Sequence, residues 1–456
     1  MSGVLTETLE GIRALFLGSR RGIRDVVLLM IPQVIAVLAG LATTILAARG
    51  LGTDGFGAYS LVMSVAGIAT VLSDLGIGQT AIRYASRAVS RSDIGGQLTI
   101  LRWAFRVRVL LSLAVTCALY LAAPALAHAW HDKAPAPLLR LGLLGGVFNA
   151  LASVPNIYFQ SLKQFERNTI VTVGQTVISF AGLLIVAWLA AWSVRSVLIA
   201  TLAGLGIGTV AFLLMVPRAA LIAGSEGFFP SARRVRNLLR GPAQEVAPTE
   251  AGIEQAPGVF AGFNLVSMVV VMVVTRADVW LMGLFLPMEQ IGIYNAATRF
   301  AMPLTIILNA INAALWPRAS AVRSIAETKS MLAQTFRLSA IVAACAAAYA
   351  IVVPLLAPLL LGEAYAPSVT LGQVLSLRYA LAILICPIGV IGYSFGMVRV
   401  YWWINLVQLA GVLTINILFL TRVGPMASAL ALITNEVIGV ALAGGFILRR
   451  IRTLKA

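Results

Sequence analysis

The segment FGAYSLVMS (residues 56–64) recurs as IGIYNAATR (residues 291–299), so that Gly57 corresponds to Gly292. The same offset between the two segments also aligns the basic residues that follow each of them. Apolar composition alone rarely produces such a register, so we interpret the chain as two copies of one structural unit.

The composition indicates that each copy lies in a membrane. The 456 residues are 60% hydrophobic and 11% charged, and the mean hydropathy is +0.93. A helix needs about 20 apolar residues to cross about 30 Å of hydrocarbon. Six such segments in each copy predict an all-α protein of about 12 transmembrane helices, at residues 26–48, 56–80, 109–130, 138–160, 170–191, 195–217, 260–286, 291–316, 338–361, 369–391, 400–421 and 424–448. Because each copy has an even number of spans, the repeat is parallel, related by an axis along the membrane normal.

The predicted spans also divide the chain into parts. We expect a cytoplasmic amphipathic helix, or alternatively a disordered tail, at 1–25, lobes at 26–217 and 260–448, a cytoplasmic linker at 218–259 and a basic tail at 449–456. Most of the 34 Lys and Arg then fall on one side, which by the positive-inside rule places both termini in the cytoplasm. The net charge of +17 is therefore explained by basic residues that orient the chain in the membrane and contact anionic lipid headgroups. We expect no nucleic-acid partner.

The sequence predicts no cofactor and no metal. Its three cysteines fall inside predicted spans without a spaced framework. His128, His131 and Asp132 share an outer loop, where three ligands indicate a solvated loop more than a metal site. The chain has no Gly-rich nucleotide-binding motif ending in Lys-Ser or Lys-Thr.

Two segments carry a family resemblance. They are AARGLGTDGFGAYSLVMSVAGIATVLSDLGIGQTAIRYAS (residues 47–86) and ADVWLMGLFLPMEQIGIYNAATRF (residues 277–300). Through them the chain resembles the polysaccharide transporters of the multidrug/oligosaccharidyl-lipid/polysaccharide exporter superfamily. The resemblance implies a MATE-like, V-shaped pair of six-helix bundles in the bacterial inner membrane. It also implies a flippase that moves polyprenyl-pyrophosphate-linked oligosaccharides, such as precursors of O-antigen lipopolysaccharide or exopolysaccharide, by alternating access.

The resemblance extends to partners and leaves alternatives open. It implies a lipid-linked oligosaccharide as substrate, surrounding membrane lipids, and a polysaccharide polymerase and export machinery as neighbours, and we expect a monomer. A cation-coupled multidrug exporter and a lipid II flippase are the alternatives within the superfamily. An exporter of cationic drugs favours carboxylates and aromatics in its cavity. A glycosyltransferase or polymerase would need a loop with catalytic carboxylates or His, so we predict no enzyme and no catalytic residue.

Charged side chains inside the predicted spans are the candidate site residues. Burying an Arg at a helix centre costs about 2.5 to 3.5 kcal/mol, so such residues usually face a cavity or a partner. Arg276, Arg299 and Arg378 would suit a diphosphate or a uronic-acid carboxylate, which guanidinium groups bind bidentately. On a straight helix the span 291–316 adds a polar face suited to sugar hydroxyls, made of Asn295, Arg299, Thr305, Asn309 and Asn312.

Three acids in the spans offer a competing interpretation. Asp74, Asp278 and Glu436 could neutralise the three arginines in structural ion pairs between helices. Glu436, in the middle of the last span, suits either a proton-coupling site or a hydrogen-bonded contact between helices. We assign Asp278 to coupling or gating. Asp74, in LSDLGIG (residues 72–78), suits helix packing or gating, with Arg83 or a neighbouring loop as its partner.

Overall fold

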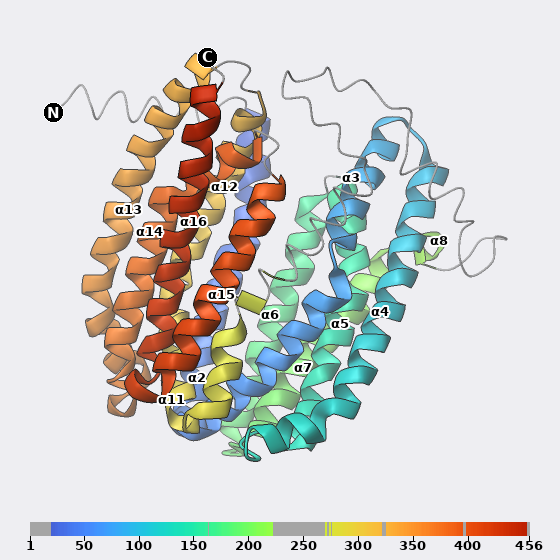
Figure 1. The fold of residues 1–456 in the computed structure, drawn as a ribbon. Coiled ribbons are helices and arrows are strands. Elements are labelled where there is room, and N and C mark those ends of the chain that lie inside the picture. The colour runs from blue at the N-terminus through green and yellow to red at the C-terminus, as the bar shows by residue number, and fades with distance from the viewer. Residues whose placement is uncertain are drawn as a thin grey trace. The chain divides into compact units, whose positions relative to one another are not determined.

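A computed structural model describes residues 20–162, 164–221, 270, 273–274, 276–321, 325–394 and 398–453. Of the predicted amphipathic segment 1–25 and the predicted linker 218–259, only 20–25 and 218–221 are described, and they belong to helices α2 and α8. Within the described ranges, every regular element is a helix (Figure 1). The helices are α2 (Arg20–Asp74), α3 (Ile77–Ser90), α4 (Ile94–Ala129), α5 (Ala136–Ser161), α6 (Phe165–Trp188), α7 (Val194–Met215), α8 (Arg218–Leu221), α11 (Met288–Ala301), α12 (Pro303–Ala321), α13 (Ile325–Leu361), the 3₁₀ turn η1 (Glu363–Tyr365), α14 (Ser368–Ser394), α15 (Val398–Val423) and α16 (Met426–Thr453).

The predicted class of membrane protein is confirmed. In the part of the chain that the structure describes, nine helices are long and apolar enough to cross a membrane, and a tenth is added if the bent pair α11 and α12 forms one span. This number is below the predicted twelve for two reasons. About half of the predicted span 260–286 lies outside the described residues, and the first two predicted spans fall largely within the single element α2.

The first two predicted spans have different ends in the structure. Helix α2 continues through the predicted loop at 49–55 and is kinked at Gly52, whose φ of 68° lies in the left-handed region that glycine tolerates. The predicted span 56–80 stops early, because α2 ends at Asp74 and α3 begins at Ile77 after Gly76, whose φ is 78°. Hydropathy misses this break because the residues on both sides of Asp74 are largely apolar.

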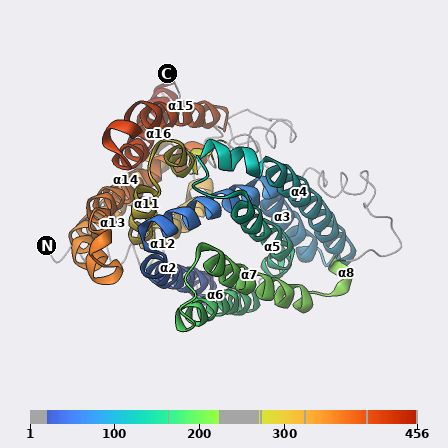
Figure 2. The same cartoon turned by 90° about the horizontal axis from the view of Figure 1, so that it is seen from below.

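The described residues form two compact units. Unit 1 takes its residues from 20–41, 270–286 and 293–453, and unit 2 takes its residues from 42–221 and 287–292. Residues 26–41, predicted in the first lobe, group with unit 1, and residues 287–292, predicted in the second lobe, group with unit 2. Within unit 1, α13 packs along α14 and α15 along α16 (Figure 1). Within unit 2, α6 packs along α7 and α4 along α5, as Figure 2 shows from below.

The repeat-related glycines approach each other within unit 2, where α2 meets α11. A Cβ atom on Gly57 would clash with the carbonyl oxygen of Met288, and one on Gly292 would clash with the carbonyl oxygen of Thr53. Thr53 and Met288 are themselves equivalent, each four residues before its glycine. The contact is therefore self-complementary, as contacts across a two-fold axis are, and it supports the repeat inferred from sequence.

The predicted span 291–316 is bent, which corrects the expected polar face. Helix α11 ends at Ala301, α12 starts at Pro303, and the two axes differ in direction by 48°. Proline lacks an N–H group and its ring clashes with the preceding turn, so it starts a new helix more readily than it continues one. Asn295 and Arg299 lie on α11 whereas Asn309 lies on α12, so the arc calculated for one straight helix is wrong.

Candidate functional site

Arg378 and Glu436 form an ion pair between α14 and α16 in unit 1. Arg378 Nη2 lies 2.6 Å from Glu436 Oε1, and the two side chains are only 18% and 16% exposed. The guanidinium also lies over the ring of Tyr379, with Cζ 4.6 Å from the ring centroid. From the sequence we expected Arg378 to bind substrate and Glu436 to serve coupling, with structural pairing as the alternative. The structure brings these two residues together in one contact.

Asp278 is held by hydrogen bonds. The hydroxyl of Tyr294 donates to its Oδ2 at 2.6 Å, and the backbone N–H of Val279 donates to its Oδ1 at 2.7 Å. Asp278 is 6% exposed and Tyr294 is fully buried. Arg276 and Arg378 both act on the carboxylate electrostatically. Unit 1 thus holds two bonded pairs, Asp278 with Tyr294 and Arg378 with Glu436, and the charge of Arg378 acts on the first pair.

The other two predicted cations have different surroundings. Arg276 is exposed although Asp278, two residues later, is buried, because residues two apart on a helix point in nearly opposite directions. Arg299 is half-buried, and its Nη1 donates to the sulfur of Met302 at 3.3 Å. Of the polar positions predicted beside them, Asn295 is half-buried and Asn309 is exposed.

A cavity of about 310 Å³ lies beside the pair of Arg378 and Glu436 in unit 1; most of its wall is apolar, and we call it the polar cavity because one carboxylate and three amide side chains line it. Glu436 lines it, together with amide side chains from α12 and α15, at Asn312, Asn405 and Gln408. Asn312 Oδ1 accepts a hydrogen bond from the thiol of Cys386, also on the wall, at 3.1 Å. Gln408 Nε2 donates to the backbone oxygen of Asn435 at 2.7 Å. Among the described residues no group of three or more His, Cys, Asp or Glu could hold a metal ion.

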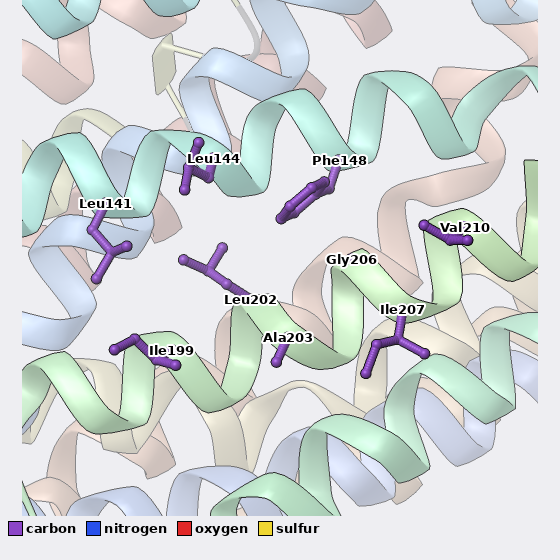
Figure 3. A pocket seen from close by; sticks show the side chains of 9 residues that line it. All are labelled: Leu141, Leu144, Phe148, Ile199, Leu202, Ala203, Gly206, Ile207 and Val210. Atoms are coloured by element: carbon purple, nitrogen blue, oxygen red, sulfur yellow. The ribbon is translucent and has the colours of Figure 1, made fainter.

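A second cavity, of about 590 Å³, lies in unit 2 between α5 and α7 and is apolar (Figure 3). Several of its wall residues are exposed on the protein surface, among them Leu144, Ile199, Ile207 and Val210. A membrane protein presents such side chains to lipid tails. We therefore treat this groove as lipid-facing surface and place the candidate site in unit 1. Its lining residues are Leu141, Leu144, Phe148, Ile199, Leu202, Ala203, Gly206, Ile207 and Val210.

Asp74 pairs with Arg108 in unit 2. Arg108 Nη1 lies 2.9 Å from Asp74 Oδ1, and the backbone N–H of Gly78 donates to the same oxygen at 3.0 Å. Asp74 thus binds the first turn of α3, where a carboxylate also interacts favourably with the helix dipole. The partner predicted from sequence was Arg83 or a neighbouring loop; the side chain of Arg83 lies outside the described residues, and the partner that the structure describes is Arg108. Helix α4 starts at Ile94, well before the predicted span at 109–130, so Arg108 is a buried helical residue.

Sequence reasoning missed Arg108, Asn405 and Gln408. Arg108 was counted among the cytoplasmic Lys and Arg because it lies just before the predicted span 109–130, although it directly precedes an apolar run. Asn405 and Gln408 were overlooked as single polar residues in the predicted span 400–421. Their spacing of three residues, which puts them on one helix face, is the signal that could have identified them.

The chain matches models of known protein families over most of its length. Two family models, both described as "Polysaccharide biosynthesis protein", match residues 23–244 and 259–370. A search of curated proteins finds no significant match.

Solved structures share the fold at low sequence identity. An inward-facing multidrug resistance MATE family transporter of the MOP superfamily matches with a TM-score of 0.69 and 16% identity, over 94% of this chain and 99% of that chain. A MATE protein in the bent conformation matches with a TM-score of 0.58 and 17% identity, over 97% and 98%. A MOP superfamily transporter from Pyrococcus furiosus, whose description states a reversed polarity of the binding pocket, matches with a TM-score of 0.58 and 15% identity, over 98% and 99%. These matches confirm the MATE-like fold.

Proposed function

Because the chain belongs to the polysaccharide transporter family of the multidrug/oligosaccharidyl-lipid/polysaccharide exporter superfamily, we propose that it is a flippase for lipid-linked oligosaccharides. Its substrates are polyprenyl-pyrophosphate-linked repeat units of O-antigen or exopolysaccharide. It moves them by alternating access across the bacterial inner membrane, with both termini in the cytoplasm. Coupling or gating involves Glu436, Asp278 and Asp74.

The observation that carries the proposal is the set of arginines in the apolar helices of unit 1. Arg276 is exposed, whereas Arg299 and Arg378 are half-buried, the latter beside Glu436. A diphosphate offers oxyanions that match the planar fork of a guanidinium, and the interaction is stronger away from bulk water. We assign substrate binding to these three arginines, with Asn295 and Asn309 as partners of sugar hydroxyls.

The experiment is a deletion strain in which polyprenyl-linked oligosaccharides are extracted and quantified. Complementation uses the wild-type gene, the double variant Arg276→Ala/Arg299→Ala and, as a control, Arg337→Ala at an exposed position of α13. We expect a repeat unit to accumulate on the cytoplasmic leaflet and to be cleared by the wild type and the control, but not by the double variant. Normal clearance by the double variant would make Arg276 and Arg299 structural.

A drug exporter is the second candidate, because the matching MATE transporter is described as a multidrug resistance protein. An exporter of cationic drugs would use carboxylates to bind them. In unit 1, however, Asp278 is engaged by Tyr294 and Glu436 is engaged by Arg378. The same deletion strain distinguishes the candidates, since raised drug sensitivity without accumulated lipid-linked oligosaccharide would identify the exporter.

A further inference from the structure

Glu436 has two different neighbours in unit 1. On one side it binds Arg378, and on the other it lines the polar cavity, whereas Arg378 is absent from the cavity wall. Tyr379 covers the guanidinium, and the charge of Arg378 also acts on Asp278 and Tyr294. The titratable groups on the cavity side are the thiol of Cys386 and the hydroxyl of Tyr401, which donates to the backbone oxygen of Gly389 at 3.0 Å.

The guanidinium of Arg378 is not fully satisfied by this arrangement. Its Nη2 reaches Glu436, but its Nε is buried and has no hydrogen-bond partner among the described residues. A guanidinium carries five N–H donors in a planar fork, and a buried donor without an acceptor is costly. Asp278 does not fill this role, because its carboxylate binds Tyr294 and Val279 and is not hydrogen-bonded to Arg378 Nε. Arg378 thus retains capacity for a further oxyanion.

We propose that Glu436 is an internal counter-ligand of Arg378, bound to it in the empty transporter and displaced from it by an oxyanion of the substrate diphosphate. This inference rests on the proposed function and deepens it. A buried arginine without an anion is strongly unfavourable, so an empty carrier needs a replacement for the substrate. Glu436 provides that replacement and keeps the empty site neutral.

The polar cavity makes the exchange feasible. A diphosphate carries more charge and more acceptor oxygens than a carboxylate, so it can compete for the guanidinium fork. The displaced carboxylate of Glu436 then needs polar surroundings, which Asn312, Asn405 and Gln408 offer on the cavity wall. The cavity is also large enough for ordered water. When the substrate leaves, Glu436 returns to Arg378.

The test measures binding of inorganic pyrophosphate to the full chain in lipid nanodiscs by isothermal titration calorimetry. Glu436→Gln removes the competing charge but keeps the shape of the side chain, so we expect affinity to rise about tenfold. The double variant Arg378→Gln/Glu436→Gln should not show this rise in pyrophosphate affinity. The matched control is Glu363→Gln, the same charge change at an exposed position of unit 1, and it should leave affinity unchanged.

An affinity in Glu436→Gln that equals or falls below that of the wild type would overturn the proposal and leave a purely structural pair. Should Glu436→Gln not fold, Glu436→Asp is measured instead. Its carboxylate sits one methylene further from Arg378, so we expect a smaller rise in affinity, and no rise counts against the proposal.

The two proposals fail separately. If no lipid-linked oligosaccharide accumulates in the deletion strain but Glu436→Gln binds pyrophosphate more tightly, the flippase assignment is rejected and the anion site at Arg378 stands. If the oligosaccharide accumulates but pyrophosphate affinity does not change, the counter-ligand alone is rejected.

Discussion

The two units each contain an arginine and a carboxylate in contact, with all four side chains less than 20% exposed, but the surroundings of the two pairs differ. In unit 2, Asp74 is bound by Arg108 and also by the N–H of Gly78. In unit 1, Glu436 is bound by Arg378 and borders a polar cavity. A carboxylate anchored to two elements holds helices together, whereas one beside a cavity can exchange its partner. Ion pairs of the same chemistry can therefore differ in role because of their neighbours.

The pairs also occupy non-equivalent places in the repeat. In the register that matches Gly57 to Gly292, the position of Asp74 is occupied by Asn309 in the second copy. The second copy thus lacks that acid, and its ion pair joins two later helices, α14 and α16. The copies agree at the glycine contact and differ in where they bury charge.

Breaking the pair in unit 2 should give the largest effect. Asp74→Ala leaves Arg108 buried without its carboxylate, which costs about 3 kcal/mol of unfolding free energy. Thermal unfolding in detergent measures the loss. The double variant Asp74→Leu/Arg108→Met should recover most of it, since both charges are gone. A stable Asp74→Ala protein would show that this pair does not hold unit 2 together.

Breaking the pair in unit 1 from the arginine side should affect transport more than stability. Arg378→Gln removes the proposed diphosphate ligand, so we expect clearance of the accumulated lipid-linked oligosaccharide to slow about thirtyfold, within the range found for buried charge pairs. Quantifying that lipid in the complemented deletion strain measures it. If Arg378→Gln lost as much stability as Asp74→Ala at equal expression, both ion pairs would have the same structural role.

The contact between the two equivalent glycines is a feature that both copies of the repeat share, and it can be tested by substitution. Gly57→Ala and Gly292→Ala each place a methyl group against a backbone carbonyl, so both should destabilise the protein by a similar amount, about 2 kcal/mol. Gly174→Ala is the control, because a Cβ there has no neighbour within 4 Å. Thermal unfolding of the three variants measures the loss of stability. Strongly unequal effects at Gly57 and Gly292 would contradict a self-complementary contact.

Thiol labelling should give the smallest effect and tests the cavity. In a background with Cys117→Ser and Cys345→Ser, Cys386 on the cavity wall should react with a hydrophilic methanethiosulfonate. The comparison is Ser112→Cys in a background that also lacks Cys386, at a 1% exposed position one turn after Arg108. We expect the Cys386 rate to be about tenfold higher, because water reaches a polar cavity but not a packed interior. Equal labelling rates would show that water reaches Cys386 no more readily than position 112, and that the two ion pairs have similar surroundings.

Much of the architecture follows from local pattern. Apolar runs, the recurrence of Gly57 as Gly292 and the basic loops predicted an all-α membrane protein of two repeated halves. The same reasoning identified Arg378, Glu436, Asp278 and Asp74 as charges that need partners. It failed at Pro303, where a span assumed to be straight is bent, and at Arg108, which was placed in a loop.

The sequence by itself determined that the chain lies in a membrane, that it is a repeat, and which residues carry charge within the apolar helices. These properties depend on about 20 neighbouring residues at a time and need no knowledge of contacts. Only the tertiary structure decided that Arg378 meets Glu436, that Tyr294 meets Asp278, and that amides from α12 and α15 share a cavity. Such pairings depend on which helix faces pack together, and residues far apart in the chain do not record that in local hydropathy.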